Sequence, residues 1–293
     1  MSSSTLAKRL FVFDFDWTLI ECDSDNWVFQ HLNKDLYQVQ LESVGKVQWT
    51  DLQQRLLGKL FESGVSRNDI EDTLSQVPFD TDMIEALTLM KAHGSELHIL
   101  SDANTVYIET ILKAHKIDHL FTSILTNPAK FDDQGRLDVV RFHGLDKAPH
   151  GCHLPCEPNL CKGQELQKLI DSQDWDQVIY MGDSTNDFCP STRLQSTDVV
   201  LARKGLLLES HITKSPELVK GEVVYWGNAQ DVLAATKIIL EIDSIPSISS
   251  SSSTTSLSTI VASNTMIPSS KSTSSLSAVE SEDSKLFART IKA

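Results

Sequence analysis

The sequence predicts an α/β protein: a doubly wound, Rossmann-like parallel sheet with an inserted all-helical cap subdomain and a disordered C-terminal tail. Several short runs are apolar throughout, which is typical of strands buried on both faces of a parallel sheet. These runs alternate with helical patterns along most of the chain, as in doubly wound proteins. One long segment near the N-terminus has helical spacing alone, and residues 244–293 are dominated by Ser and Thr.

The composition limits the choice of partners and location. The 293 residues carry a net charge of −14, which disfavours binding to nucleic acid or to an anionic membrane. The first residues lack the apolar core of a signal peptide, and no apolar run is long enough to span a bilayer. Five cysteines without a secretory signal argue against a disulfide framework. We therefore expect a cytoplasmic protein that binds a small molecule.

The first predicted strand, residues 10–13, runs directly into Asp14 and Asp16. Side chains alternate along a strand, so both carboxylates should project to the same side. Two like charges at a buried strand end repel each other, and a divalent cation would compensate them. We expect a metal-assisted catalytic site at the carboxyl end of this strand. The alternative is a pair of surface acids in a turn.

Residues 25–90 have helical spacing and little strand character. A crossover between two strands needs only one helix, so this segment predicts a helical cap above the strand ends. Its last helical pattern, residues 81–94, is typical of a core helix. The predicted domains are therefore an α/β core of residues 1–24 and 91–243, a cap of residues 25–90, and a tail of residues 244–293.

The rest of the core is predicted from alternating strand and helix patterns. A β-hairpin is expected over residues 130–143, with its turn at 133–135. Further strands are expected at residues 96–104, 121–128, 177–184, 198–205 and 221–226, and helices at 105–116, 162–170 and 228–242. The Ser/Thr-rich tail cannot bury enough apolar surface to offset its ordering entropy, so we expect it to be disordered and a candidate for phosphorylation.

Polar residues at several of these element ends should meet, because the carboxyl ends of parallel strands share one crevice. They are Asp14, Asp16, Ser101, Lys162, Asp183 and Asp187. An acidic cluster can hold Mg²⁺, which prefers oxygen ligands, while a hydroxyl and an ammonium can bind phosphate oxygens. Phosphoryl transfer depends on this kind of positioning and charge neutralisation.

Four segments also carry a family resemblance. DFDWT from Asp14, Ser101 after an apolar strand, Lys162, and GDSTND ending at Asp187 match, in order, the four motifs of the haloacid dehalogenase superfamily. More narrowly, DFDWTLIECDSD, SDAN, the C-x-x-x-C-x-x-x-x-C-K-G segment and GDSTNDFCP resemble the phosphoethanolamine/phosphocholine phosphatase branch. That branch also includes enzymes assigned to pyridoxal phosphate, thiamine monophosphate and pyrophosphate. The resemblance spans roughly residues 9–240.

The resemblance implies a role for each matching residue. Asp14 would be the nucleophile that forms an aspartyl-phosphate intermediate, and Asp16 would serve as general acid and then general base. Ser101 and Lys162 would bind the transferring phosphoryl group. Mg²⁺ would be held by Asp14, Asp183 and the main-chain carbonyl of Asp16. Asp187 would orient either the water shell of the metal or Lys162.

The substrate is predicted from two further acids, Asp25 and Asp102, which match residues that the branch uses near its substrate. Carboxylates near a phosphate site would repel a dianion unless the substrate carries a cation elsewhere. This favours phosphoethanolamine or phosphocholine, and a pyrophosphatase or a thiamine monophosphate or pyridoxal phosphate phosphatase is the alternative. Asp25 and Asp102 could instead be helix N-caps. A catalytically idle scaffold whose tail recruits partners is the alternative outside the enzyme class.

A Cys- and His-containing loop leaves a second metal question open. His150, Cys152, His153, Cys156 and Cys161 suggest zinc, but their spacing is not that of a standard zinc finger. Cys189 could supply a fourth thiolate if the fold brings it close. The alternative is a plain loop with buried thiols.

Overall fold

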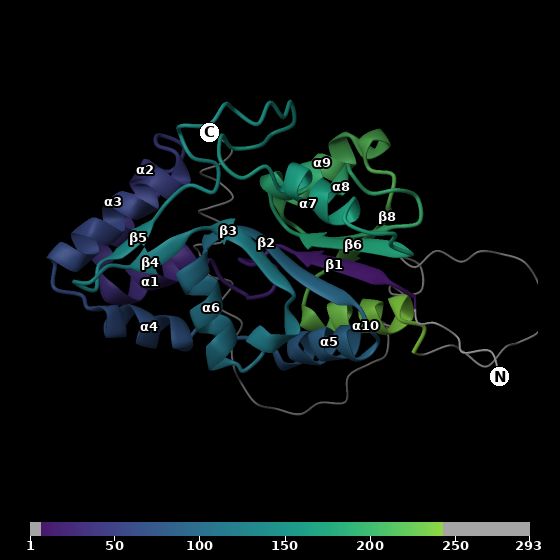
Figure 1. The fold of residues 1–293 in the computed structure, drawn as a ribbon, viewed down its shortest axis with the longest axis horizontal. Helices are drawn as coiled ribbons and strands as arrows, with labels where there is room; N and C mark the ends of the chain where they lie inside the picture. The colour runs from purple at the N-terminus through teal and green to yellow at the C-terminus, as the bar shows by residue number, and fades with distance from the viewer. Residues whose placement is uncertain (1–6, 243–293) are drawn as a thin grey trace, which may run out of the picture.

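A computed structural model describes residues 7–242, so the expected tail of residues 244–293 lies outside the described residues. Six parallel strands form one sheet in the order β3-β2-β1-β6-β7-β8 (Figure 1). Their bounds are β1 Arg9–Phe13, β2 Glu96–Asn104, β3 Ser123–Asn127, β6 Gln177–Gly182, β7 Val199–Arg203 and β8 Glu222–Trp226. The strand order reverses between β1 and β6, and this switch point is where such sheets bind ligands.

Helices cover both faces of the sheet, which confirms the doubly wound architecture (Figure 1). Phe11 and Phe13 of β1 pack towards one helical layer, and Leu10 and Val12 pack towards the other. Burial on both faces explains why the strand is apolar throughout. The first layer contains α5 (Thr81–Ala92), α6 (Thr105–Ala114) and α10 (Ala229–Ile239); the second contains α7 (Lys162–Ile170), α8 (Phe188–Ser191) and α9 (Leu207–Lys214).

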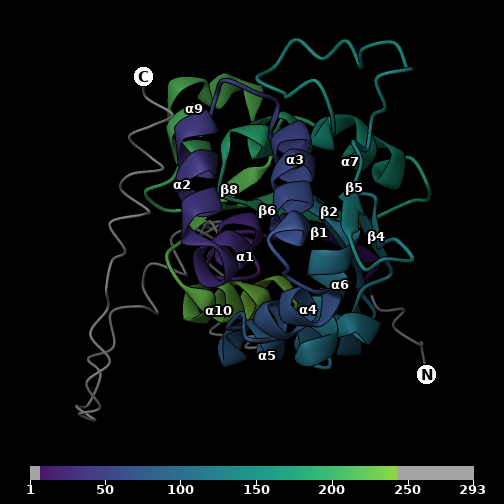
Figure 2. The ribbon, with the colours of Figure 1, turned by 90° about the vertical axis from the view of Figure 1, so that its left-hand side faces the viewer.

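Four helices and a hairpin lie to one side of the sheet (Figures 1 and 2). Gln54 joins these helices to the hairpin: its side chain donates to Asp138 Oδ1 at 3.0 Å and accepts from the Val139 backbone N–H at 2.6 Å. The hairpin and its turn confirm the prediction for this segment. The elements are α1 (Ser24–Leu32), α2 (Lys34–Ser43), α3 (Trp49–Glu62), α4 (Arg67–Ser75), β4 (Ala129–Phe131) and β5 (Leu137–Val139).

Helix α5 differs from its place in the predicted cap of residues 25–90. It packs against α10 and β2, within the layer that covers the sheet, as its core-helix pattern suggested. The predicted cap included this helix because helical periodicity does not reveal which partner an apolar face will contact. The helices set apart from the sheet end at Ser75, while the division into domains itself stays a prediction.

Three short 3₁₀ helices complete the described chain: Asp118–Leu120, Thr185–Asp187 and Pro216–Leu218. Within residues 7–242, no helix combines the length and apolar character needed to cross a bilayer.

Candidate active site

Three buried aspartates meet at the switch point of the sheet. Asp14 follows β1 and Asp183 follows β6, and these strands are direct neighbours in the sheet (Figure 1). The Asp14 backbone N–H extends their pairing by donating to the Met181 carbonyl at 2.9 Å. Asp187 comes from the 3₁₀ helix just after β6. One carboxylate oxygen from each of the three lies within 4.8 Å of the others, and each residue is at most 6% exposed.

Lys162 lies between two of these acids, at the first residue of α7. Its Nζ is 2.8 Å from Asp14 Oδ1 and 2.8 Å from Asp187 Oδ1, and the residue is 1% exposed. Burial by itself would lower the pKa of Lys162, but the two carboxylates outweigh it and hold the pKa above its ordinary value. The ammonium therefore stays charged at neutral pH.

Both carboxylate oxygens of Asp187 accept hydrogen bonds from other groups of the protein. Its Oδ1 accepts from Lys162 and from the Tyr180 hydroxyl at 2.6 Å. Its Oδ2 accepts from the backbone N–H groups of Asp183 at 3.1 Å and Ser184 at 2.9 Å. Of the two roles considered for Asp187, this geometry favours orienting Lys162 over orienting a metal's water shell.

The charges of this cluster fit a divalent cation. Three carboxylates and one ammonium leave two negative charges uncompensated. Burial raises the pKa of Asp14, and Asp187 raises it further. Burial and then Asp187 likewise raise the pKa of Asp183 to about 8. A bound cation would reverse these shifts, and carboxylate oxygens are the ligands that Mg²⁺ prefers. Asp14 and Asp183 are the acids best placed to hold it.

The side chain of Asp16 lies apart from this cluster of three. It accepts from the Ser24 backbone N–H at 2.9 Å and from the Ser24 hydroxyl at 3.2 Å. Burial raises the pKa of Asp16, and Asp23 and Asp25 raise it further. Only its main-chain carbonyl was expected at the metal, and that assignment stays a prediction. A carboxyl group with a raised pKa is suited to donate a proton at neutral pH.

Ser101 and Asp102 lie where the pairing of β2 with β3 shifts register, between Leu100 and Asn104. Irregularities of this kind re-aim side chains near active sites. Ser101 is fully buried, and its hydroxyl accepts from the Ala103 backbone N–H at 3.2 Å. Asp102 accepts from the Asn186 side chain at 2.9 Å, which ties the end of β2 to the 3₁₀ helix after β6.

The N-cap alternative for Asp25 and Asp102 is wrong. The N-cap of α1 is Asp23, which accepts from the Asn26 backbone N–H, and the N-cap of α6 is Asn104. Asp25 instead accepts from the indole N–H of Trp49 at 2.7 Å, across to the start of α3. Sequence patterns place a cap only to within a few residues, because several polar residues precede each of these helices.

Asp23 is a further acid that the sequence did not single out. Burial raises its pKa to about 6. Asp23 adds to the raised pKa values of Asp16 and Asp25, and Asp102 in turn raises that of Asp23. We call Asp16, Asp23, Asp25 and Asp102 the acidic group of the site. The run of acids from Asp14 to Asp25 was the available signal for it.

Trp17, directly after Asp16, has a left-handed backbone conformation with φ of 55°. Its carbonyl accepts from the Arg203 guanidinium, which also lies over the Trp226 ring, 4.9 Å from its centroid. Left-handed backbone is unfavourable for a bulky residue and persists where the surrounding contacts require it. This turn carries the chain from Asp14 towards the acidic group.

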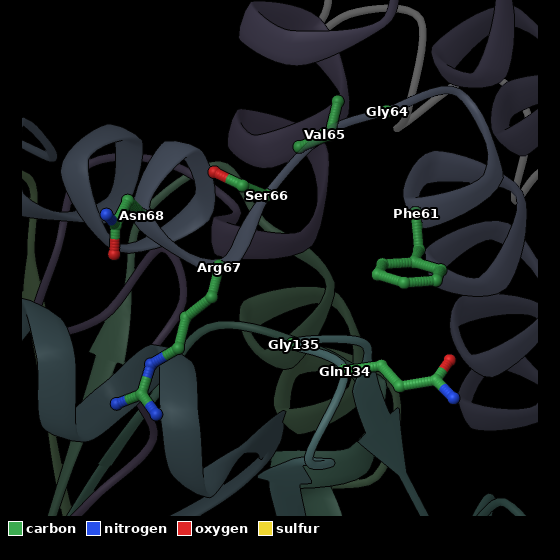
Figure 3. Close-up of a pocket in the computed structure, with 8 residues that line it drawn as sticks. All are labelled: Phe61, Gly64, Val65, Ser66, Arg67, Asn68, Gln134 and Gly135. Carbon is green, nitrogen blue, oxygen red and sulfur yellow. The ribbon is translucent and has the colours of Figure 1, made fainter.

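A cavity of about 410 Å³ lies elsewhere, between the α3–α4 connection and the hairpin turn (Figure 3). Phe61, Arg67 and Gln134 are among the residues that line it. None of the predicted site residues borders this cavity, so it is separate from the catalytic acids.

Solved structures share this fold. A phosphoserine phosphatase from T. onnurineus matches with a TM-score of 0.52 and 16% identity, over 80% of this chain and 98% of that one. A phospho-aspartyl intermediate analogue of phosphoserine phosphatase also gives 0.52, with 14% identity, over 78% and 98% of the two chains. With the four ordered motifs, the fold and the acidic site define a phosphatase of the haloacid dehalogenase superfamily.

The family follows from the sequence comparisons. The model of the "Putative Phosphatase" family matches residues 9–240, and the chain belongs to this family. A thiamine phosphate phosphatase-like protein of Arabidopsis thaliana is 39% identical, over 77% of this chain and 93% of its own. Inorganic pyrophosphatase 2 of the same organism is 37% identical, over 79% and 82%. Pyridoxal phosphate phosphatase PHOSPHO2 of Mus musculus is 31% identical, over 80% and 99%.

These relatives also decide between the enzyme and scaffold alternatives. They are named phosphatases or pyrophosphatases, and the chain is accordingly a phosphatase, not a catalytically idle scaffold. They differ in the substrate that their names give.

Gly182 tests the position of Asp187. A Cβ at Gly182 would lie 2.5 Å from Cγ and 2.7 Å from Cβ of Asp187, so Gly182→Ala must displace that carboxylate and with it Lys162. We expect kcat to fall by about 100-fold, the effect of a small misplacement of a catalytic group. Gly227→Ala, after β8, is the matched control because its nearest neighbour would be 3.5 Å away. Steady-state kinetics with unchanged kcat in Gly182→Ala would contradict this reading of the site.

The raised pKa of Asp183 predicts how the free energy of unfolding depends on pH. In the metal-free protein its pKa is about 8 when folded and near 3.8 when unfolded, so the folded state binds the extra proton between these values. Its contribution to the free energy of unfolding therefore falls as pH rises from about 4 to about 8. Mg²⁺ should stabilise the protein most at the upper end, where protons compete least with the metal. Urea unfolding across this range, with chelator or Mg²⁺, measures both effects.

The control is Asp183→Asn, which should lose this pH-dependent component and most of the stabilisation by Mg²⁺. Equal pH slopes in the two proteins, or equal Mg²⁺ effects at pH 5 and pH 8, would count against the assignment.

Proposed function

We propose that the protein hydrolyses small phosphomonoesters with Mg²⁺, through an aspartyl-phosphate on Asp14. The observation that carries this proposal is the buried Lys162, held between Asp14 and Asp187 beside Asp183 at the switch point. Such an arrangement supplies a nucleophile, a fixed positive charge and a place for a cation within one crevice.

Asp14 Oδ1 is held by Lys162 and by the Phe15 backbone N–H at 2.7 Å. Its second oxygen, Oδ2, is therefore the atom that we propose attacks phosphorus. The bond from phosphorus to the ester oxygen breaks as the bond to Oδ2 forms. Lys162 and the Ser101 hydroxyl would bind the phosphoryl oxygens, and Asp187 would keep Lys162 in place. Mg²⁺, bound by Asp14, Asp183 and the Asp16 carbonyl, would neutralise the phosphoryl charge.

Asp16 supplies the proton. Burial and its acidic neighbours raise its pKa, so the carboxyl group can protonate the leaving oxygen at neutral pH. The resulting carboxylate then takes a proton from the water that attacks the aspartyl-phosphate. The two bonds to Ser24 hold the side chain at the start of α1, on the side of the helices set apart from the sheet.

The acidic group supports a substrate that carries a positive charge besides its phosphate. Asp16, Asp23, Asp25 and Asp102 repel one another, and a cation near them would relieve that repulsion. Phosphoethanolamine and phosphocholine have such a cation. Thiamine monophosphate, through its thiazolium ring, is a second candidate, supported by the Arabidopsis relative named for thiamine phosphate. Pyrophosphate carries no cation, and the acidic group disfavours it.

Asp14→Asn tests the nucleophile. The amide has nearly the same shape but cannot attack phosphorus, so turnover should fall to background, a loss of at least about 10⁴-fold. Hydrolysis of p-nitrophenyl phosphate measures the loss, and exposed Asp133→Asn is the control. Excess chelator should abolish wild-type activity, and Mg²⁺ should restore it. An active Asp14→Asn protein, or full activity in chelator, would refute the mechanism.

Asp25→Asn and Asp102→Asn test the substrate class, because each keeps an acceptor oxygen while losing the charge. We expect kcat/KM for phosphocholine to fall by at least about tenfold relative to p-nitrophenyl phosphate, the loss of one charge-assisted contact. Thiamine monophosphate and phosphoethanolamine should follow phosphocholine. Unchanged ratios in both variants would refute cation pairing without affecting the Asp14 mechanism. A wild-type preference for pyrophosphate would also contradict it.

A further inference from the structure

Four cysteine side chains come together in the fold, and one of them is next to Lys162 in the sequence. Three are close in the sequence, and the fourth, Cys189, comes from a later segment. Cys152 and Cys156 belong to the loop before α7, Cys161 is the N-cap of α7, and Cys189 lies in α8. Their Sγ atoms form a closed ring: 3.5 Å for Cys152–Cys156 and Cys152–Cys189, and 3.9 Å for Cys156–Cys161 and Cys161–Cys189. All four lie within 4.8 Å of one another.

These separations match a tetrahedral metal–thiolate centre. With Zn–S bonds of about 2.3 Å, the sulfur atoms of a tetrahedron are about 3.8 Å apart. A disulfide would require about 2.0 Å, and all four cysteines are free thiols. Hydrogen bonds among thiols are weak, so they give little reason for four to converge.

The surrounding backbone is shaped for this convergence. A Cβ on Gly163 would overlap the Cys189 Sγ, so glycine is the residue that lets this thiol reach the cluster. Cys161 makes no side-chain cap hydrogen bond to α7, which leaves its sulfur available. Both ring nitrogens of His150 face backbone groups, the Glu157 carbonyl at 2.8 Å and the Cys152 N–H at 3.2 Å. His150 is therefore not a fifth ligand.

We propose that Cys152, Cys156, Cys161 and Cys189 bind one structural Zn²⁺. Four protein ligands close the coordination sphere, which is typical of a structural site, not a catalytic one. The ion would fasten the loop before α7 to α7 and α8. Cys161 immediately precedes Lys162, and Cys189 follows Asp187 by two residues, so the same ion would anchor both ends of the Lys162–Asp187 contact.

Metal analysis of the full chain, purified without added metal or chelator, tests the proposal. We expect about one zinc per chain, and Co²⁺ exchanged into the site should show the intense visible absorption of tetrahedral thiolate coordination. Cys152→Ser should lose the zinc, whereas Cys22→Ser should keep it because Cys22 is outside the cluster. Asp183→Asn should also keep it, which separates this centre from the acidic site.

Three results would overturn the proposal. The first is wild-type protein that neither contains zinc nor binds Zn²⁺ or Co²⁺ stoichiometrically, and the second is zinc that is lost in Asp183→Asn but kept in Cys152→Ser. The third is a disulfide between two of the four cysteines in protein purified from a reducing cytoplasm. The measurements on wild-type protein decide the question even if Cys152→Ser does not fold. As a second readout, removing the zinc should lower the midpoint of thermal unfolding in wild type and in Cys22→Ser alike.

Discussion

The structure depends on one electrostatic constraint: three carboxylates are buried around a single buried ammonium. Asp14, Asp183 and Asp187 would repel one another without Lys162, and Lys162 would be costly to bury without them. Burial, and after it the charge of Asp187, raises the pKa of Asp14 and Asp183, and a divalent cation would compensate the remaining negative charge. Gly182 and Tyr180, at the end of β6, serve this arrangement by leaving room for Asp187 and donating to it.

The charged groups of this cluster come from two parts of the fold. Neighbouring strands β1 and β6 present Asp14 and Asp183, and the second helical layer delivers Lys162 at the start of α7. On the other side, Asp25 bonds to Trp49 at the start of α3, so the acidic group joins the sheet to the helices set apart from it. We therefore propose that the site has two sides: one, around Lys162, would bind the phosphate, and the other, the acidic group, would select the rest of the substrate. The proposed zinc centre would brace the first of these.

The sequence was informative where one local pattern has one structural outcome. Strands buried on both faces are apolar throughout, so β1 and β6 and the acids after them were predictable, as were the hairpin and its turn. Contacts between distant segments were left as alternatives. The family resemblance offered both Lys162 and a metal's water shell as partners of Asp187, and Cys189 was only a possible fourth thiolate. The spacing did not show that Asp23, not Asp25, caps α1. Helix α5 has the pattern of a core helix and packs against α10 and β2, but periodicity does not identify a packing partner, so its inclusion in the predicted cap stays a prediction.

The central claim is a covalent bond between Asp14 and the phosphoryl group, and chemical trapping tests it most directly. Borohydride reduces an acyl phosphate to an alcohol, so it would convert a phosphorylated aspartate to homoserine in protein quenched during turnover. We predict that peptide mass spectrometry will find homoserine at position 14, only with substrate and Mg²⁺ present. Homoserine at another acid, or none while phosphate is released, would contradict the account.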